Sequence, residues 1–420
     1  MMARLSRRKM LSSPPEPRSP RTPTTAFDWD AGTQGRRSAK LLTRILFTTL
    51  FIFFLQTNNT QAAGLTEVLS GYYKILSAFS KSSTTKEGIF YALQRLRLEF
   101  TPKLTKNLEA NFTYDHELML NDFSNTPDFN FIRQKNQRTL AWFDADKVIT
   151  DTKHIYERHL LHRAFLKFGS PHSRVTFGKQ LIDWGKMRFY SPLDLFNQPL
   201  PSDIEADERV GFDALNVELS SNNFSGMNIL YGPGRTNAQD SYGLKFNKKL
   251  GTYDTTLIAA KHIKEKVLGF GFDGYLWNTG LRGEFTYTRA GKERYPRASL
   301  GLDHTFSSET NIILEYFYNG AANNNFSAFS GSILESRERL SSKKNLVSAS
   351  ISRKLTPLFK AQLAAIYDIN GKSAFVNPEL SYNIKENLDA KAGAQLFAET
   401  PGSEFQDSNN LYYCELKLFF

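Results

Sequence analysis

Apolar and polar residues alternate along much of this chain, in segments of about nine to twelve residues that follow one another from about residue 65 onward. In residues 107–118, for example, Leu108, Ala110, Phe112 and Tyr114 alternate with Glu109, Asn111, Thr113 and Asp115. Because successive side chains of a β-strand point to opposite faces, these segments predict strands with one apolar and one polar face. Almost no window carries the apolar stripe of a helix, so the pattern predicts an all-β fold.

The end of the chain shows this period most clearly. One face of residues 411–420 would carry Tyr412, Cys414, Leu416, Leu418 and Phe420, whereas Glu415 and Lys417 would lie on the other. Taken alone, this segment fits the edge strand of a soluble sandwich. It equally fits a strand of a membrane barrel, whose outer residues face lipid and whose inner residues face a polar lumen.

The lengths of the links between strands distinguish the two folds. Short links are expected at 101–106, 170–173, 221–225, 248–251, 278–280, 307–309, 356–358 and 385–387. Longer ones are expected between them, at 81–90, 119–161, 185–213, 232–240, 289–296, 320–344 and 399–410, with shorter exceptions near Lys264 and Gly371. Such alternation is typical of outer-membrane barrels. The sequence therefore predicts a transmembrane antiparallel up-and-down β-barrel of about 16–18 strands, the lower number applying if the weak first strand at 71–79 and one other fail.

A presequence is expected before the barrel. The apolar run at 45–55 is about half the length of a spanning helix, and Lys40 and Arg44 precede it, so it predicts the core of a signal peptide. Small residues place the expected cleavage next to Ala63 or Gly64. The predicted organisation is a disordered basic extension with the signal n-region at 1–44, the rest of the signal at 45–63, and the barrel at 64–420.

Charge and cysteine content narrow the functional classes. Residues 1–63 hold ten Lys or Arg and three Asp or Glu, a net charge of +7, so the remainder has +11 − 7 = +4. This small excess gives no indication of a nucleic-acid partner. The one cysteine, Cys414, excludes an intrachain disulfide framework and a cysteine-rich metal site.

The polar faces of the predicted strands carry both charges, which predicts a hydrated lumen. The candidate lumen residues are Arg95, Arg97, Glu99, Arg163, Lys167, Arg174, Arg282 and Glu284. Further residues on the same predicted faces are Glu109, Asp115, Lys245, Asp303, Glu315, Arg353, Glu415 and Lys417. The slight basic excess indicates either a weak anion preference or solvated charges that set no selectivity.

The segment 174–213 is a candidate constriction. Gly185, Pro199 and Pro201 interrupt strand pairing, and aromatic residues among them would let a long loop keep a fixed shape. Its candidate residues are Trp184, Lys186, Arg188, Asp194 and Asn197. The loop would either lean into the lumen or cap a strand end on the outside.

Several short motifs in and before this segment resemble those of porin-like outer-membrane barrels of Gram-negative bacteria. The motifs are His162-Arg163-Ala164-Phe165-Leu166, Gly178-Lys179-Gln180, Trp184-Gly185, Pro192-x-Asp194-Leu195-Phe196-Asn197 and Gly211-x-Asp213-Ala214. Gln198 departs from the pattern, because many relatives have Pro directly after the Asn. The alternating last strand ending in Phe420 is likewise similar to the assembly signal of bacterial outer-membrane proteins.

The resemblance implies a channel in the cell outer membrane for the diffusion of small hydrophilic solutes, with no chemistry performed and no cofactor. Its expected partners are those solutes, outer-membrane lipids and the barrel-assembly machinery. The sequence leaves open which solute passes, whether the channel is gated and whether it is a homotrimer. The alternatives are a structural or adhesive barrel and a barrel-embedded hydrolase. No His residue is accompanied by a nucleophile elbow or a complete metal-ligand set, which disfavours the hydrolase.

Overall fold

A computed structural model describes residues 68–83, 85–136, 142–198, 201–205, 208–221, 225–322 and 340–420. All of them belong to one compact unit, Ala62–Phe420. The predicted basic extension, signal peptide and cleavage position lie outside the described residues, as do Pro199 and most of the predicted 320–344 link. Within the described ranges, no helix is both long enough and apolar enough to cross a membrane.

The described residues form nineteen strands in one sheet. The first ten are β1 (Leu69–Lys81), β2 (Gly88–Phe100), β3 (Leu108–Asn121), β4 (Lys147–Asp151), β5 (Ile155–Gly169), β6 (Ser173–Gln180), β7 (Phe212–Ser221), β8 (Ser225–Gly232), β9 (Ser241–Leu250) and β10 (Tyr253–His262). The others are β11 (Glu265–Leu276), β12 (Thr279–Ala290), β13 (Glu293–Thr305), β14 (Thr310–Asn319), β15 (Asn345–Thr356), β16 (Phe359–Asp368), β17 (Ser373–Lys385), β18 (Leu388–Ala398) and β19 (Leu411–Phe419). The helices are α3 (Pro127–Asn136) and the short η1 (Asn237–Gln239).

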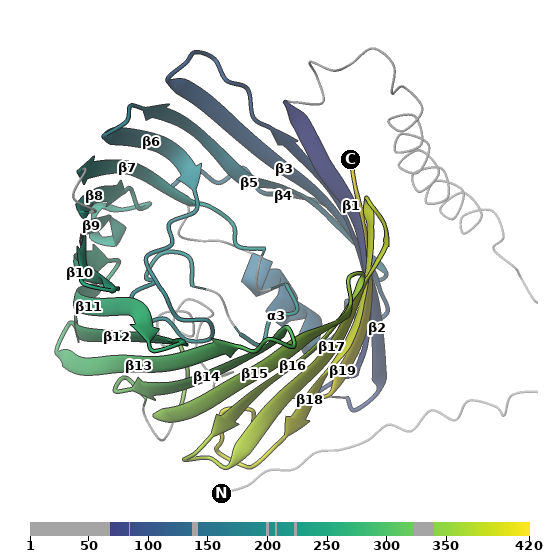
Figure 1. The fold of residues 1–420 in the computed structure, drawn as a ribbon. Helices are drawn as coiled ribbons and strands as arrows, with labels where there is room; N and C mark the ends of the chain where they lie inside the picture. Colours follow the sequence, from purple (N-terminus) through teal and green to yellow (C-terminus); the bar gives the residue numbers. More distant parts are fainter. Residues whose placement is uncertain are drawn as a thin grey trace, which may run out of the picture. The chain divides into compact units, whose positions relative to one another are not determined.

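The sheet closes on itself, because β1 pairs antiparallel with both β2 and β19 (Figure 1). The short β4 pairs with the 156–159 end of β5, whereas β6 pairs with the 164–169 end. Since β3 also pairs directly with β5, β4 is additional to the ring. Eighteen strands therefore close the barrel, nineteen minus β4, which confirms the predicted fold. Within the ring, each of the eighteen strands pairs with two neighbours.

The links between strands alternate in length around most of the ring, and the exceptions are the short links at 263–264, 291–292 and 369–372. Short turns join β2 to β3, β5 to β6 and β7 to β8, on what we call the turn rim, and longer links such as 181–211 lie on the opposite, loop rim. The link expected over 289–296 is wrong in length: β12 and β13 are joined by only Gly291 and Lys292. Both ends of the barrel meet on the turn rim, where the backbone N–H groups of Gly71 and Phe420 each donate to the other's carbonyl oxygen, at 3.0 and 3.1 Å.

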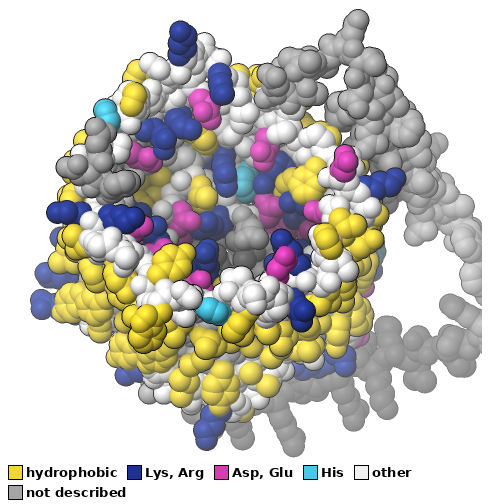
Figure 2. Space-filling view, in the orientation of Figure 1, with side chains coloured by type: hydrophobic (Ala, Val, Ile, Leu, Met, Phe, Trp, Pro, Cys, Tyr) yellow, Lys and Arg dark blue, Asp and Glu magenta, His cyan; other side chains and the backbone are white. Residues whose placement is uncertain are grey.

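The two faces of the wall differ as the alternation predicts. On β19, Tyr412, Cys414 and Leu416 are exposed, whereas Tyr413 between them is buried on the inner face. Figure 2 shows the resulting hydrophobic outer wall, and charged side chains of both signs around the hollow at the mouth of the barrel. One placement is wrong: Arg353 follows the parity of the exposed Val347 and Ile351, so it lies on the outer face. It is next to the turn rim, where a long basic side chain can reach water.

Inside the ring, Figure 1 shows α3 and the segment that leads from β6 to β7. Phe129 of α3 is fully buried and packs with Leu76, Leu93, Met119 and Tyr156 on the inner face of β1–β5. One side of the lumen is therefore filled by packed side chains.

Candidate functional site in the barrel lumen

The segment between β6 and β7, residues 181–211, forms a loop that we call the lumen loop. Asn197 links the two ends of this loop. Its Oδ1 accepts the backbone N–H of Ile182 at 2.9 Å, and its Nδ2 donates to the carbonyl of Val210 at 2.6 Å. The guanidinium of Arg209 donates further hydrogen bonds to Asp183 and Asp194, at 3.0 and 3.1 Å. These bonds join the start of the loop to its end, so the loop keeps a fixed shape at its base.

Apolar residues anchor the first half of the lumen loop to the wall. Ile182, Trp184 and Leu193 pack with Leu230, Ile258 and Val267 of β8, β10 and β11. Glycines in the wall make room for them: a Cβ on either Gly269 or Gly271 would lie 2.6 Å from a methyl of Leu193. This seat explains why Trp184 and Leu193 are almost fully buried, at 2% and 0% exposure.

A second apolar contact lies further along the wall. Tyr190 stacks on Phe317 of β14 with ring centroids 5.0 Å apart and an interplanar angle of 9°. Phe189 and Tyr190 belong to a cluster with Leu346, Ile366 and Phe375 of β15, β16 and β17. The loop therefore contacts the inner wall from β8 to β17.

Two wall carboxylates hold the backbone between these contacts. Glu284 of β12 accepts the N–H groups of Lys186, Met187 and Leu193 and the hydroxyl of Ser191. Glu315 of β14 accepts the N–H groups of Arg188 and Phe189, at 2.6 and 2.9 Å. Hydrogen bonds to an ionised acceptor are stronger than neutral ones, so this stretch of backbone is firmly held. The side chain of Arg188 remains exposed and that of Lys186 half-buried.

Asp194 lies in the interior of the loop. Its side chain is 2% exposed. Its Oδ2 accepts from Arg209 at 3.1 Å, whereas its Oδ1 has no hydrogen-bond partner. Burial is the largest influence on this carboxyl and raises its pKa to about 8, with the nearby Asp183 acting in the same direction. The placement gives Asp194 a role in holding the loop, alongside Asn197.

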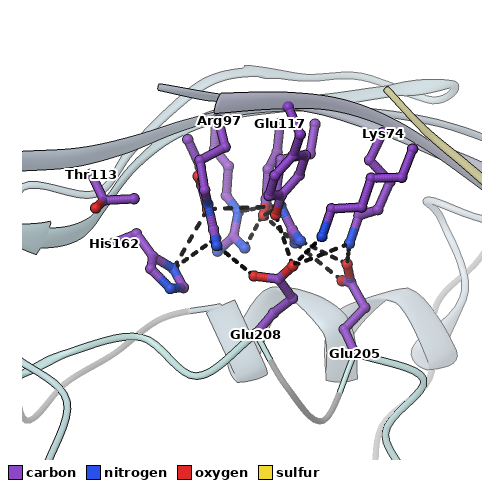
Figure 3. A network of polar contacts seen from close by, with 12 residues as sticks. Lys74, Arg97, Thr113, Glu117, His162, Glu205 and Glu208 are labelled. Atoms are coloured by element: carbon purple, nitrogen blue, oxygen red, sulfur yellow. Dashed lines mark hydrogen bonds and ion pairs between the residues drawn. The ribbon is translucent and has the colours of Figure 1, made fainter. Parts of the chain in front are cut away.

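The second half of the lumen loop, residues 201–205 and 208–210, returns along β1 and β2, and we call it the return arm. Glu205 accepts two hydrogen bonds from Arg95, at 2.6 and 3.1 Å, and one from Lys74 (Figure 3). Glu208 accepts from Arg97 at 2.6 Å and from the hydroxyl of Tyr72 at 2.8 Å. Ion pairs therefore fasten the return arm, in contrast to the apolar contacts of the first half.

The arginines under the return arm are also bound to the wall. Arg97 donates from Nε and Nη2 to both oxygens of Asp115, each at 2.7 Å. Arg95 donates from Nε to Glu117 at 2.8 Å, and Glu117 also accepts from Arg158. Each guanidinium thus holds a β3 carboxylate on one edge and a loop carboxylate on the other, which suits its planar arrangement of donors.

Charge balance in this network depends on the return arm. Its cations are Lys74, Arg95, Arg97, Arg158 and Lys417, and its anions are Asp115, Glu117, Glu205, Glu208 and Glu415. Five cations minus five anions gives zero; without Glu205 and Glu208 the wall alone would carry +2. Attraction to Arg95 and Lys74 outweighs burial and holds the pKa of Glu205 well below its usual range; Arg97 and Lys74 do the same for Glu208, whose pKa is about 2.

The other candidate lumen residues lie apart from this network. Lys167 pairs with Glu109 at 3.3 Å and Arg174 with Glu218 at 3.1 Å, both toward the turn rim. Arg282 pairs with Asp303 under the first half of the loop. Glu99 and Arg163 are half-buried on the inner face. Within the described ranges, no group of three or more His, Cys, Asp or Glu residues is placed to bind a metal ion.

Comparisons with known proteins address the fold. No family model matches the chain, and neither does any curated protein. The crystal structure of OccAB3 from Acinetobacter baumannii is similar with a TM-score of 0.51 and 12% identity, covering 84% of this chain and 98% of that chain. The outer membrane protein OpdK from Pseudomonas aeruginosa has a TM-score of 0.50 at 8% identity, covering 84% and 99%. The chain therefore shares the fold of an outer-membrane protein. OccK8 (OprE) from Pseudomonas aeruginosa gives the same TM-score and identity, with coverage of 84% and 98%.

Sequence reasoning missed the function of Glu205 and Glu208 in this site. They are 110 and 111 residues from their arginine partners, a separation that no local pattern bridges. The available signal was two glutamates three residues apart in a loop, opposite a lumen with a basic excess. Lys74 was missed because the first strand is weakly patterned.

Proposed function

We propose that the protein is an outer-membrane channel for the diffusion of small hydrophilic solutes. The observation that carries this proposal is the lumen loop, which is folded inside an eighteen-strand ring and held there by Glu284, Glu315 and the return arm. A ring of this size is wide enough for an aqueous passage, whereas eight strands leave an interior that side chains fill. A loop fastened inside such a ring narrows the passage at a fixed position.

Lys186 and Arg188 are the residues that we propose set the ion preference of the constriction. Their backbones are held by Glu284 and Glu315, so their side chains extend from a fixed base. Arg188 is exposed, whereas Trp184, Asp194 and Asn197 are buried and support the loop. Fixed charges beside a narrow passage select ions through their field.

The proposal includes export by the N-terminal signal peptide, insertion by the barrel-assembly machinery and residence in the outer membrane. The shared fold of OpdK, an outer membrane protein, supports this location. The apolar outer wall supports it independently, because a contiguous apolar surface around a closed barrel is suited to lipid.

Reconstitution tests the proposal. The purified, folded barrel, residues 64–420, is added to a planar bilayer. The current is then recorded with salts of different ion size. Stepwise openings and swelling of vesicles in small sugars are expected. A folded, inserted barrel that neither conducts nor passes any solute would overturn the channel and leave a structural barrel.

A further inference from the structure

Four cations stand side by side on neighbouring strands next to the loop rim. Lys261 of β10 is directly opposite Lys266 of β11, Lys266 is opposite Arg289 of β12, and Arg289 is opposite Arg294 of β13. We call these four residues the basic row. Since adjacent strands are about 4.8 Å apart, the row extends for about 15 Å along the wall.

The basic row lies on the outer face of the barrel. Lys266 and Arg289 share the parity of Leu268 and Tyr287, which are 64% and 45% exposed and lie opposite each other one row closer to the membrane-spanning band. Beyond Lys261 the row continues with Tyr242 and then Tyr231, both exposed. Cations and tyrosines directly above an apolar band are typical of the boundary between lipid and water.

Among the described residues, the links beside Lys266, Arg289 and Arg294 are short. The β10–β11 and β12–β13 hairpins turn at 263–264 and 291–292, and both turns are among the shortest links on the loop rim. They add Lys264 and Lys292, which are exposed. Lys266, Arg289 and Arg294 are therefore exposed at this height, whereas Lys261 is half-buried against the 233–240 link.

Like charges directly opposite each other destabilise a sheet unless an anion offsets them. In the part of the chain that the structure describes, Lys266, Arg289 and Arg294 form no ion pair. The adjacent Glu265 points inward and accepts from Tyr295, and Lys261 donates to the carbonyls of Ala238 and Asp240. No carboxylate among the described residues pairs with these three cations, which leaves them available to an anion from outside the barrel.

We propose that the basic row binds the phosphorylated headgroups of lipids in the outer leaflet. Phosphate oxygens accept several hydrogen bonds at once, and the guanidinium groups of Arg289 and Arg294 donate in a matching plane. The acyl chains of the same lipid would lie against Leu268 and Tyr287 below. The proposal rests on the outer-membrane location proposed above, with the loop rim outward, but not on conduction.

The test uses the folded barrel in detergent and bisphosphorylated lipid A as the probe, with bound lipid counted by native mass spectrometry. The variant K266Q/R289Q/R294Q is expected to bind lipid A roughly a hundredfold more weakly than the unmodified chain, because it lacks three cations that each attract an anionic lipid. Lys261 is kept because it holds the backbone near η1. Equal affinity for both proteins would overturn the proposal.

Matched controls separate specific contacts from general charge. K248Q/R353Q/K385Q removes three exposed cations next to the turn rim and is expected to leave affinity unchanged. K266R/R289K/R294K keeps the charge but removes both guanidinium groups, so it is expected to bind lipid A severalfold more weakly than the unmodified chain, a loss that can be measured even if the glutamine variant does not fold. Inorganic phosphate at equal concentration should not displace lipid A; displacement would assign the row to a free anion instead. Conductance should be the same in all variants, so its loss or absence bears on the channel and not on the row.

Discussion

Arg95 and Glu205 join the wall of the barrel to the lumen loop through two parallel hydrogen bonds, at 2.6 and 3.1 Å. Only the side chain of Arg95 is nearly buried; that of Glu205 is 23% exposed. The first half of the loop is held by apolar packing and by carboxylates that bind its backbone. The return arm is held mainly by charge. The two halves should therefore respond differently to changes in charge.

Neutralising Glu205 and Glu208 together should release the return arm. The variant E205Q/E208Q keeps the shape of both side chains but leaves the wall with an excess charge of two, five cations against three anions. Breaking a largely buried ion pair from one side typically costs roughly 3–5 kcal/mol. We expect a larger and noisier single-channel conductance, and loss of the folded band at a lower temperature on a heating gel.

The matched control for this variant is E309Q/E386Q, which removes two exposed carboxylates from turns on the turn rim. It should conduct like the unmodified barrel. If the two double variants conduct alike, the return arm does not limit the passage.

Asp194 should make the stability of the barrel depend on pH. Its pKa is about 8 in the folded protein against an ordinary value of 3.8, so the folded state binds the proton more tightly than the unfolded state. This stabilisation is fully present below about pH 4 and is lost as the pH rises through about 8. The asparagine of Asp194→Asn resembles the protonated side chain. The unfolding temperature of this variant should therefore fall less between about pH 5 and 9 than that of the unmodified chain.

The pKa values of Glu205 and Glu208 are lowered, so their contribution has the opposite sign. It is present above the ordinary glutamate value of 4.5 and is lost only as the pH falls toward about 2. The two effects therefore occupy different pH ranges. If the unfolding temperatures of the unmodified chain and Asp194→Asn change by the same amount from about pH 5 to 9, Asp194 does not have the role assigned to it.

The sequence predicted the wall well because each face follows from neighbouring residues. The alternation at Tyr412, Tyr413 and Cys414 is a local property, and the strand geometry converts it directly into an outer and an inner face. The course of the lumen loop depends instead on contacts such as Trp184 beside Gly243 and Tyr190 on Phe317, which bring distant strands together. No period in the sequence encodes those contacts.

Arg353 and β4 show two further limits. Polarity marks the inner face only at mid-height, because next to a rim a charged side chain reaches water from either face. β4 lies in a link that is otherwise irregular, and its five residues are too few for a clear period. Both errors arise where the strand leaves the apolar band.

Arg188 should influence ion selectivity. Arg188→Glu changes the local charge by two at an exposed side chain whose backbone N–H is bound to Glu315. We expect the permeability ratio from reversal potentials to shift toward cations by more than about tenfold at low salt, because a change of two charges alters the energy of an ion passing within about 4 Å by about 2 kcal/mol. Arg353→Glu makes the same charge change on the outer face and should leave the ratio unchanged. If both variants retain the original ratio, Arg188 does not lie at the constriction.

Phe420 should be required for efficient assembly. Its backbone N–H and carbonyl pair with Gly71, and its ring lies 3.0 Å from the place where a side chain on Gly71 would begin. Phe420→Ala keeps the backbone bonds and removes only the ring, so it tests recognition of the aromatic side chain separately from closure. We expect severalfold less heat-modifiable barrel in the outer membrane, measured by the mobility shift between heated and unheated samples. Phe306→Ala, at an exposed aromatic residue of the β13–β14 turn, is the control. A normal amount of folded barrel in Phe420→Ala would mean that closure at Gly71 suffices and that the ring carries no signal.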